Sequence, residues 1–258
     1  MSQPTVGFVG GGRIARIILT AWGRAKLPLS DVAVADIDAA VLSRLQTDFP
    51  AITVSQDNRQ AASQDVVLFG LHPPVFPAVL GEISGSLSKT AVLVSLAPRW
   101  TMGKISAALG GFDRLARAIP NAPSVVGQGY NPVSFAGGLP ADDRTRVHAL
   151  FAPLGACPEV AEDTLEAYAI LSAMGPTYLW FQLYQLAELG RGFGMTREAA
   201  LEAVAAMTAG AASTMTEAGL SPEAVMDLIP VKPLAPIEAT VRESYASILG
   251  ALHAKLKG

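Results

Sequence analysis

Charged side chains are scarce in this sequence: Asp, Glu, Lys and Arg make up 16% of its 258 residues, and the net charge is −3. No basic excess is available to neutralise the phosphates of a nucleic acid or the surface of an anionic membrane. We therefore expect neither nucleic acid nor membrane among its partners. Half of the residues are hydrophobic, which is enough to bury a sizeable core.

Cysteine and histidine are also rare. Cys157 is the single cysteine, which excludes a disulfide framework and suits a reducing cytosol. The histidines, His72, His148 and His253, are scattered, so we expect no metal site. The N-terminus runs into an expected strand within a few residues, which leaves no room for a secretory signal. We therefore expect a cytoplasmic protein.

One long stretch, Ala167–Ala187, contains no charge at all. A membrane-spanning helix needs about 20 apolar residues, so the length alone permits a span. Gly175-Pro176 is expected to interrupt the stretch, and Gln182 and Gln185 are polar. We interpret it as two helices buried in a protein interface.

Three consecutive glycines stand between a short apolar run, Thr5–Val9, and a helical pattern, Arg13–Lys26. Gly10, Gly12 and Ala15 fit the G-x-G-x-x-G/A fingerprint of a dinucleotide-binding turn. Gly10 would permit the tight turn, Gly12 the approach of a pyrophosphate, and Ala15 close packing of helix on strand. The residues expected to hold the cofactor phosphates at this helix start are Gly10, Gly11, Gly12, Arg13 and Ile14.

An acidic residue, Asp36, ends the second expected strand, roughly 20 residues beyond the glycines. A carboxylate there would accept hydrogen bonds from the ribose hydroxyls and repel a 2′-phosphate. No basic residue follows at once, since the next residues are Ile37 and Asp38. This favours NAD(H), with NADP(H) possible. Alternatively, Asp36 or Asp38 caps the following helix.

Strands and helices alternate up to Ile119, which predicts an α/β fold with a doubly wound, Rossmann-type, mostly parallel sheet. Ligands of such sheets bind beyond the carboxyl ends of the strands, where Gly70–Pro74, Leu96–Trp100 and Pro120–Pro123 fall. From Thr164 onward the pattern is helical only. We therefore expect a dinucleotide-binding domain over residues 1–160 and an all-helical dimerisation and substrate domain over residues 161–258.

Four motifs resemble those of one enzyme family. They are Gly7-Phe-Val-Gly-Gly-Gly12, Arg117-Ala-Ile-Pro-Asn-Ala-Pro123, Leu171-Ser-Ala-Met-Gly-Pro-Thr-Tyr178 and Gly194-Met-Thr-Arg-Glu-Ala-Ala200. Together, over nearly the whole chain, they resemble the pyrroline-5-carboxylate reductases, which complete proline biosynthesis. The resemblance implies reduction of a cyclic imine that carries a carboxylate, with hydride from NADPH or NADH. It also implies a homodimer of intertwined helical domains, which often assembles further.

The resemblance fails where the substrate should bind. The family carries a Ser-Pro-Gly-Gly-Thr-Thr loop whose backbone donors and threonine hydroxyl meet the substrate. The matching stretch here is Val231-Lys-Pro-Leu-Ala-Pro236, in which the glycines and threonines are replaced. Proline has no N–H to offer. We therefore expect weak or absent activity on pyrroline-5-carboxylate itself and reduction of some other imine or carbonyl acid.

Two cations are candidates for binding an anionic substrate. Arg99 follows an expected strand end and has a planar guanidinium suited to a carboxylate. Lys232, in the altered loop, would supply a point charge and is also a catalytic candidate. Each is alternatively a solvated surface residue. Tyr178 is a candidate proton donor to the substrate nitrogen, or else a core aromatic.

Further residues at the strand ends are expected to line the cofactor. His72 and Pro73 form a rigid turn, and the His72 imidazole would contact the cofactor or relay a proton. Ala97 lies in the turn before Arg99. Asn121 would position loops or hold the carboxamide end of the cofactor. For His72 a purely structural role is the alternative.

A C=N bond is the favoured target because a protonated iminium accepts hydride without a strong general acid. A ketone needs such an acid. Hydroxyacid dehydrogenases that resemble this layout carry a lysine in the matching helical run, but Ala167–Ala187 contains neither lysine nor histidine. The predicted function is thus an NAD(P)H-dependent reductase of a small anionic imino acid. A hydroxyacid or alcohol dehydrogenase acting on C=O, and a dinucleotide-binding protein that has lost catalysis, remain as alternatives.

Overall fold

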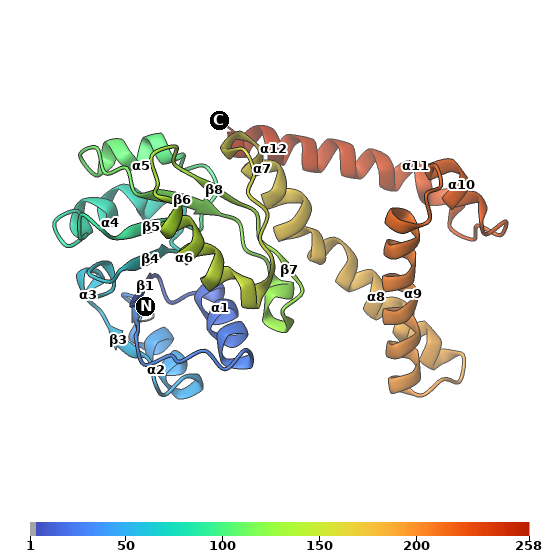
Figure 1. Ribbon diagram of the computed structural model, residues 1–258. Helices are drawn as coiled ribbons and strands as arrows, with labels where there is room; N and C mark the ends of the chain where they lie inside the picture. The colour runs from blue at the N-terminus through green and yellow to red at the C-terminus, as the bar shows by residue number, and fades with distance from the viewer. Residues whose placement is uncertain (1–3, 258) are drawn as a thin grey trace. The chain divides into compact units, whose positions relative to one another are not determined.

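The computed structural model describes residues 4–257 and divides the chain into two compact units (Figure 1). The first comprises the residues up to Met174 together with the C-terminal residues from His253, and the second is Gly175–Leu252. The turns that follow residue 160 remain in the first unit because Leu165 and Ala169 pack against Ile119. The helical part that we expected from residue 161 therefore begins within that unit.

A seven-stranded sheet in the order β3-β2-β1-β4-β5-β6-β8 forms the centre of the first unit. All neighbouring strands are parallel except β8, which pairs antiparallel with β6. The strands are β1 (Val6–Val9), β2 (Val32–Ala35), β3 (Thr53–Ser55), β4 (Val66–Phe69), β5 (Val92–Ser95), β6 (Leu115–Ala118) and β8 (Val133–Phe135). The predicted mostly parallel, doubly wound sheet is confirmed.

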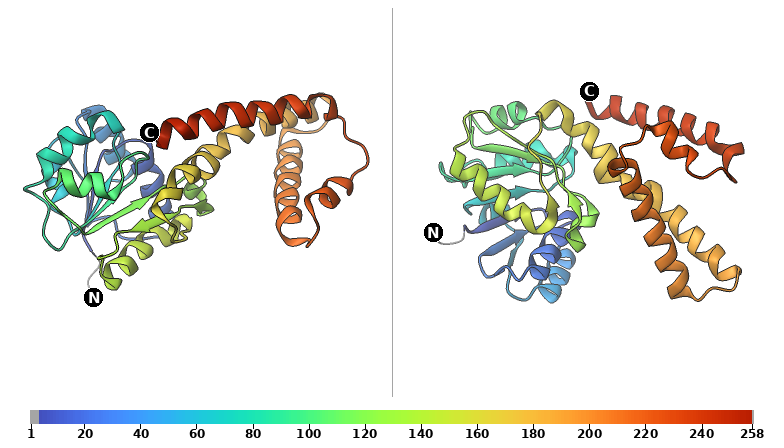
Figure 2. Two further views of the ribbon diagram at one scale, coloured as in Figure 1. Left: turned by 90° about the horizontal axis from the view of Figure 1, so that it is seen from above. Right: turned by 45° about the vertical axis from the view of Figure 1, so that its right-hand side comes forward.

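Helices cover both faces of this sheet (Figures 1 and 2). Along β4, Val66 and Leu68 face one hydrophobic cluster and Val67 and Phe69 the other, because successive strand residues point to opposite faces. The first cluster is completed by α1 (Arg13–Arg24), α2 (Ala39–Asp48) and α6 (Ala141–Phe151), and the second by α3 (Asn58–Ala62), α4 (Phe76–Ile83) and α5 (Met102–Ala108). Burial on both faces explains the unbroken apolar runs in the sequence.

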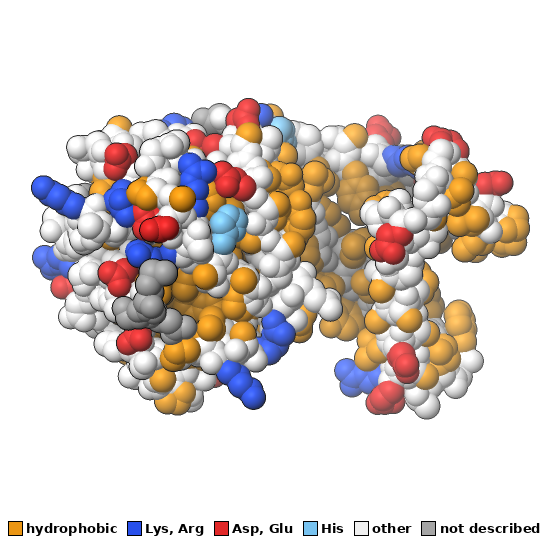
Figure 3. All heavy atoms as spheres, in the orientation of Figure 1, with side chains coloured by type: hydrophobic (Ala, Val, Ile, Leu, Met, Phe, Trp, Pro, Cys, Tyr) orange, Lys and Arg blue, Asp and Glu red, His pale blue; other side chains and the backbone are white. Residues whose placement is uncertain are grey.

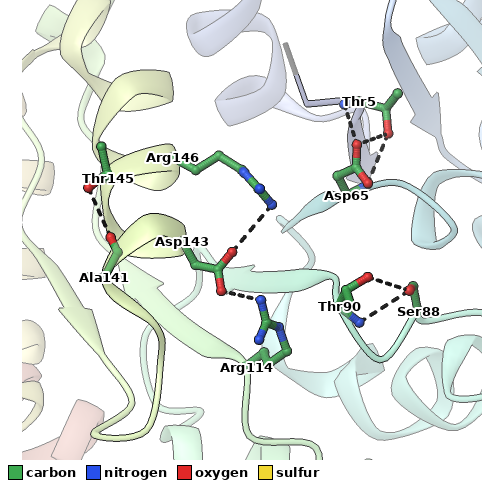
Figure 4. A network of polar contacts seen from close by, with 9 residues as sticks. All are labelled: Thr5, Asp65, Ser88, Thr90, Arg114, Ala141, Asp143, Thr145 and Arg146. Atoms are coloured by element: carbon green, nitrogen blue, oxygen red, sulfur yellow. Dashed lines mark hydrogen bonds and ion pairs between the residues drawn. The ribbon is translucent and has the colours of Figure 1, made fainter. Parts of the chain in front are cut away.

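Polar contacts fix the N-terminal edge of the sheet (Figure 4). The Asp65 carboxylate accepts a hydrogen bond from the Thr5 backbone N–H at 2.9 Å, which joins the starts of β1 and β4. Also in Figure 4, Asp143 of α6 forms ion pairs with Arg114, which precedes β6, and with Arg146 of its own helix. A small sheet of β7 (Gly129–Tyr130) and β9 (Gly155–Ala156) connects α6 to the rest of the unit.

Gly7 in β1 lies against the backbone of α3. A Cβ added to Gly7 would stand 1.8 Å from the carbonyl oxygen of Ala61. The added Cβ is fixed to the backbone of β1, and the Ala61 carbonyl belongs to the backbone of α3, so the strand or the helix would have to move.

We expect Gly7→Ala to lower the free energy of unfolding by about 1–3 kcal/mol, the usual cost of overpacking, or more. Gly12→Ala is the matched control, because a Cβ at Gly12 meets no atom within 4 Å. Urea unfolding of both variants checks this. Equal stabilities would show that α3 yields at no cost.

The second unit is helical and contains α8 (Gly175–Gly192), α9 (Arg197–Glu217), α10 (Pro222–Asp227) and α11 (Ala235–Ser244). A π-helical turn, η6 (Tyr245–Leu249), joins α11 to α12 (Gly250–Lys257). α8 and α9 form an antiparallel pair (Figure 2, right), and a Cβ added to Gly190 would stand 3.2 Å from the Cβ of Ala200, so glycine allows the close approach.

The predicted break at Gly175-Pro176 is wrong. Helical structure runs without interruption from α7 (Leu165–Tyr168) through a π-helical turn, η5 (Ala169–Met174), into α8. Pro176 has no N–H for the carbonyl of Ser172, four residues earlier. The Asn121 side-chain amide donates to that carbonyl instead, at 3.0 Å. A side chain from the loop after β6 thus donates to the carbonyl that Pro176 cannot serve.

Large apolar side chains are exposed along the helices of the second unit (Figure 3). They include Trp180, Phe181, Tyr184, Phe193, Ile229, Leu234 and Ile248. Phe181 is 67% exposed and Phe193 is 81% exposed, which is far beyond the scattered apolar residues of an ordinary surface. None of the helices within residues 4–257 combines the length and apolar character that crossing a bilayer requires.

Candidate active site

The glycine turn lies at the carboxyl edge of the sheet, beside the point where strand order reverses between β1 and β4. Gly10 has φ +103°, and a Cβ there would stand 2.8 Å from the carbonyl oxygen of Gly70, so only glycine fits without strain. Gly12 borders open space, which leaves its backbone accessible to a ligand. Ala15, in the first turn of α1, is fully buried. This arrangement fits a pyrophosphate at the helix N-terminus, next to Arg13 and Ile14.

Asp36 lies next to the glycine turn. One carboxylate oxygen accepts a hydrogen bond from the Gly11 N–H at 2.8 Å, and the other accepts one from the Asp38 N–H at 2.9 Å. A carboxylate has about four acceptor positions, so two remain for ribose hydroxyls. The helix cap is Asp38, whose side chain accepts a bond from the Ala40 N–H. Asp38 is therefore the cap of α2, and ribose binding by Asp36 stays a prediction.

The turns after β4 and β5 form the next part of this edge. His72 is exposed and immediately precedes a 3₁₀ turn that begins at Pro73. Ala97 is 4% exposed, so its small side chain is buried beneath the loop. Arg99 is exposed and has φ +77°, a left-handed conformation that is unusual for a residue with a side chain.

Asn121, after β6, is a buried structural connector. Its side-chain oxygen accepts a hydrogen bond from the Tyr130 N–H at 3.1 Å, and its side-chain nitrogen donates to Ser172 O. Its backbone N–H donates to Asn131, whose oxygen also accepts a bond from the Ser124 hydroxyl. The loop-positioning role predicted for Asn121 matches these contacts.

Tyr178 and Lys232 belong to the second unit. The Tyr178 ring lies 6.1 Å from that of Tyr245. Burial, followed by the nearby Tyr245 hydroxyl, raises the pKa of Tyr178 above its usual value, so its hydroxyl keeps its proton at neutral pH. Lys232 lines an apolar groove of about 750 Å³ with Met226, Leu234 and Tyr245.

The loop from Val231 to Pro236 offers few backbone donors. The Ala235 N–H donates to Lys232 O at 3.1 Å, and the Ile237 N–H donates to Leu234 O at 3.0 Å. Pro236 has no N–H. The start of α11 therefore directs these two donors back onto loop carbonyls, and Lys232 is the cationic side chain that the loop carries.

Sequence reasoning missed two acids, Glu162 and Glu166, which contact the β5–α5 loop. Glu166 accepts a hydrogen bond from the Arg99 N–H at 3.0 Å, and Glu162 accepts one from the Met102 N–H at 2.6 Å. Both also bind Arg117, a fully buried residue of β6. An arginine in the otherwise apolar run Leu115–Ala118 was the available signal, because a buried cation needs an anionic partner.

Comparisons with known proteins agree with this geometry. Residues 5–99 match the family described as NADP oxidoreductase, coenzyme F420-dependent. The chain is 29% identical over 227 residues to the pyrroline-5-carboxylate reductase of Arabidopsis thaliana, covering 86% of this chain and 80% of that protein. The first unit is therefore of a type that binds nicotinamide dinucleotides.

Solved structures of similar architecture extend the match to the full length. A pyrroline-5-carboxylate reductase from Coxiella burnetii is 26% identical, with TM-score 0.72 over 99% of this chain and 95% of that one. The pyrroline carboxylate reductase of Plasmodium falciparum, solved with NADP bound, has TM-score 0.85 at 19% identity, covering 100% and 98%. The sheet followed by helices is common to all three.

Proposed function

We propose that this chain, a member of the pyrroline-5-carboxylate reductase family, is an NAD(P)H-dependent oxidoreductase that reduces the C=N bond of a small anionic imino acid. Similarity to pyrroline-5-carboxylate reductases over 86% of the chain is the observation that supports this function most strongly. The glycine turn fits the cofactor, which supplies the hydride. The protein supplies binding, orientation and exclusion of water.

The substrate side rests on two cations. Arg99 extends from the carboxyl edge of the sheet, where ligands of such folds bind. Lys232 lies in a loop where Pro233 and Pro236 have no N–H and where the Ala235 N–H donates to Lys232 O. We propose Arg99 and Lys232 as the cations that recognise the substrate carboxylate, and the protonated Tyr178 hydroxyl as the candidate proton donor. The product is the saturated cyclic amino acid, formed by transfer of hydride to carbon and a proton to nitrogen.

A substrate panel tests the function. The purified protein is mixed with NADH or NADPH and with pyrroline-5-carboxylate, its six-membered homologue, neutral 1-pyrroline or a 2-keto acid. Oxidation of the cofactor with an anionic cyclic imine, and slower oxidation with pyrroline-5-carboxylate than with a better-fitting one, is expected. Turnover of keto acids alone would establish a C=O dehydrogenase, and cofactor binding without any turnover would indicate a lapsed enzyme.

The proposed cofactor preference is for NADH. A 2′-phosphate beside Asp36 would meet a carboxylate that already faces the glycine turn through its bond to Gly11. We expect NADH to bind at least about tenfold more tightly than NADPH, which corresponds to 1.4 kcal/mol. Fluorescence titration of both cofactors checks this, and Asp36→Asn should reduce the difference. Tighter binding of NADPH by the parent protein would contradict the role of Asp36.

We further propose that the protein is a homodimer or larger homo-oligomer through helices of the second unit. Exposed Phe181 and Phe193 carry more apolar surface than a stable monomer leaves in water. Light scattering in detergent-free buffer should give at least twice the chain mass of 26.8 kDa. A monodisperse monomer at micromolar concentration would refute the assembly while leaving the reductase proposal open to its own assay.

A further inference from the structure

Two carboxylates grip the loop between β5 and α5, residues 96–101, from outside that loop. Glu166 Oε1 accepts the Arg99 N–H at 3.0 Å, and Glu162 Oε1 accepts the N–H of Met102, the first residue of α5, at 2.6 Å. The contacts connect residues that are 67 and 60 positions apart in the chain. The loop is therefore held in the middle and at its end.

One guanidinium joins the two carboxylates. Arg117 Nη2 donates to Glu166 Oε1 at 2.6 Å, and Arg117 Nη1 donates to Glu162 Oε1 at 3.1 Å. The Arg117 side chain is fully buried, and Glu166 is 6% exposed. Burial favours a raised pKa for Glu166, but hydrogen bonds from Arg117 and from the Arg99 N–H outweigh it and hold the pKa below its usual value. The carboxylate therefore stays charged at neutral pH.

The residue that this cluster holds is in a strained conformation. Within residues 4–257, Arg99 and Lys26 are the residues other than glycine with positive φ. Side-chain-bearing residues keep such a conformation only where their surroundings impose it. The bond from the Arg99 N–H to Glu166 is the contact that acts directly on this peptide group. Released from it, residue 99 is expected to relax toward negative φ and to redirect its guanidinium.

We propose that Glu162 and Glu166 are positioning residues that act through the β5–α5 loop to aim Arg99 at an anionic substrate group. Arg117 holds the two carboxylates together, and the loop transmits their position to the Arg99 side chain. The ligand class is a carboxylate, and this inference rests on the proposed reduction of an anionic imine. Glu166 has the larger effect, because it bonds Arg99 itself, and Glu162 fixes the loop where α5 begins.

The first test needs no turnover. Amide hydrogen exchange of Arg99 and Met102 is measured by NMR in the parent, in Glu166→Gln and in Glu162→Gln. Loss of a charge-assisted bond should speed exchange at Arg99 about tenfold in Glu166→Gln, and at Met102 in Glu162→Gln. Asp163→Asn is the control, because Asp163 is exposed on the same segment. Unchanged exchange in both Gln variants would overturn the proposal.

The second test separates aiming from general support. In the parent background, Glu166→Gln should raise the KM for the anionic imine about tenfold and leave the KM for neutral 1-pyrroline within about twofold. In an Arg99→Ala background the same change should have little effect, because interacting sites are non-additive. Equal losses in both backgrounds, or on both imines, would show a merely structural role. If the parent reduces no imine, the proposed function fails. Hydrogen exchange still tests whether Glu162 and Glu166 hold the β5–α5 loop.

Discussion

Replacing Arg117 by methionine is expected to lower the free energy of unfolding by about 3–5 kcal/mol at neutral pH. Methionine fills most of the volume but leaves the Glu166 carboxylate, 6% exposed, without its counter-charge. An uncompensated buried charge is among the costliest single defects in a folded protein. Arg191→Met is the control, because Arg191 pairs with Glu188 at an exposed position where an ion pair contributes at most about 1 kcal/mol.

The loss in Arg117→Met should depend on pH. In the parent the pKa of Glu166 is lowered, so its stabilisation is complete above the unfolded pKa of about 4.3 and is lost as pH falls through the folded pKa. In the variant, burial without the guanidinium should raise that pKa, so the penalty disappears when the carboxyl takes up a proton. Both effects reduce the difference in the free energy of unfolding between parent and variant as pH falls.

Urea unfolding at pH 7 and near pH 4 measures this gap. A loss of less than about 1 kcal/mol at pH 7, or a gap that widens in acid, would show that Glu166 is solvated or paired elsewhere once Arg117 is gone.

The sheet could be predicted because its strands leave a local signal. β4 is the clearest case: Val66–Phe69 is buried on both faces and flanked by helical patterns, so four consecutive apolar residues suffice to identify it. The glycine turn is equally local, since the positive φ of Gly10 and the open space at Gly12 follow from the residues themselves. Asp36 could be placed because it directly follows its strand.

The contacts of Glu162 and Glu166 with the β5–α5 loop could not be predicted, because they join segments that are distant in the sequence. Nothing near Arg99 in the sequence indicates that its N–H meets Glu166, 67 residues later, or that its φ is positive. The prediction of a break at Gly175-Pro176 failed for the same reason. The missing N–H of Pro176 predicts the end of a helix. The sequence does not show that Asn121, a distant residue, donates to the Ser172 carbonyl.

Removing the two candidate cations is expected to have the largest effect on activity. Arg99→Ala and Lys232→Ala should each raise KM, or lower kcat/KM, about 10- to 150-fold for the anionic substrate, the equivalent of one charge-assisted hydrogen bond of about 1.5–3 kcal/mol. The reason is chemical: Pro233 and Pro236 have no N–H and the Ala235 N–H donates to Lys232 O, so we expect side-chain cations to take a large share in binding the carboxylate.

Steady-state kinetics on the anionic imine and on neutral 1-pyrroline measure this dependence, with cofactor binding followed by fluorescence. Binding of NADH should be unchanged, because neither residue belongs to the glycine turn. Lys89→Ala is the matched control, since Lys89 is exposed and precedes the opposite end of β5. Parent-like kinetics in both variants would identify Arg99 and Lys232 as surface charges, and an equal loss on the neutral imine would show that they support the fold of the site rather than its recognition of a carboxylate.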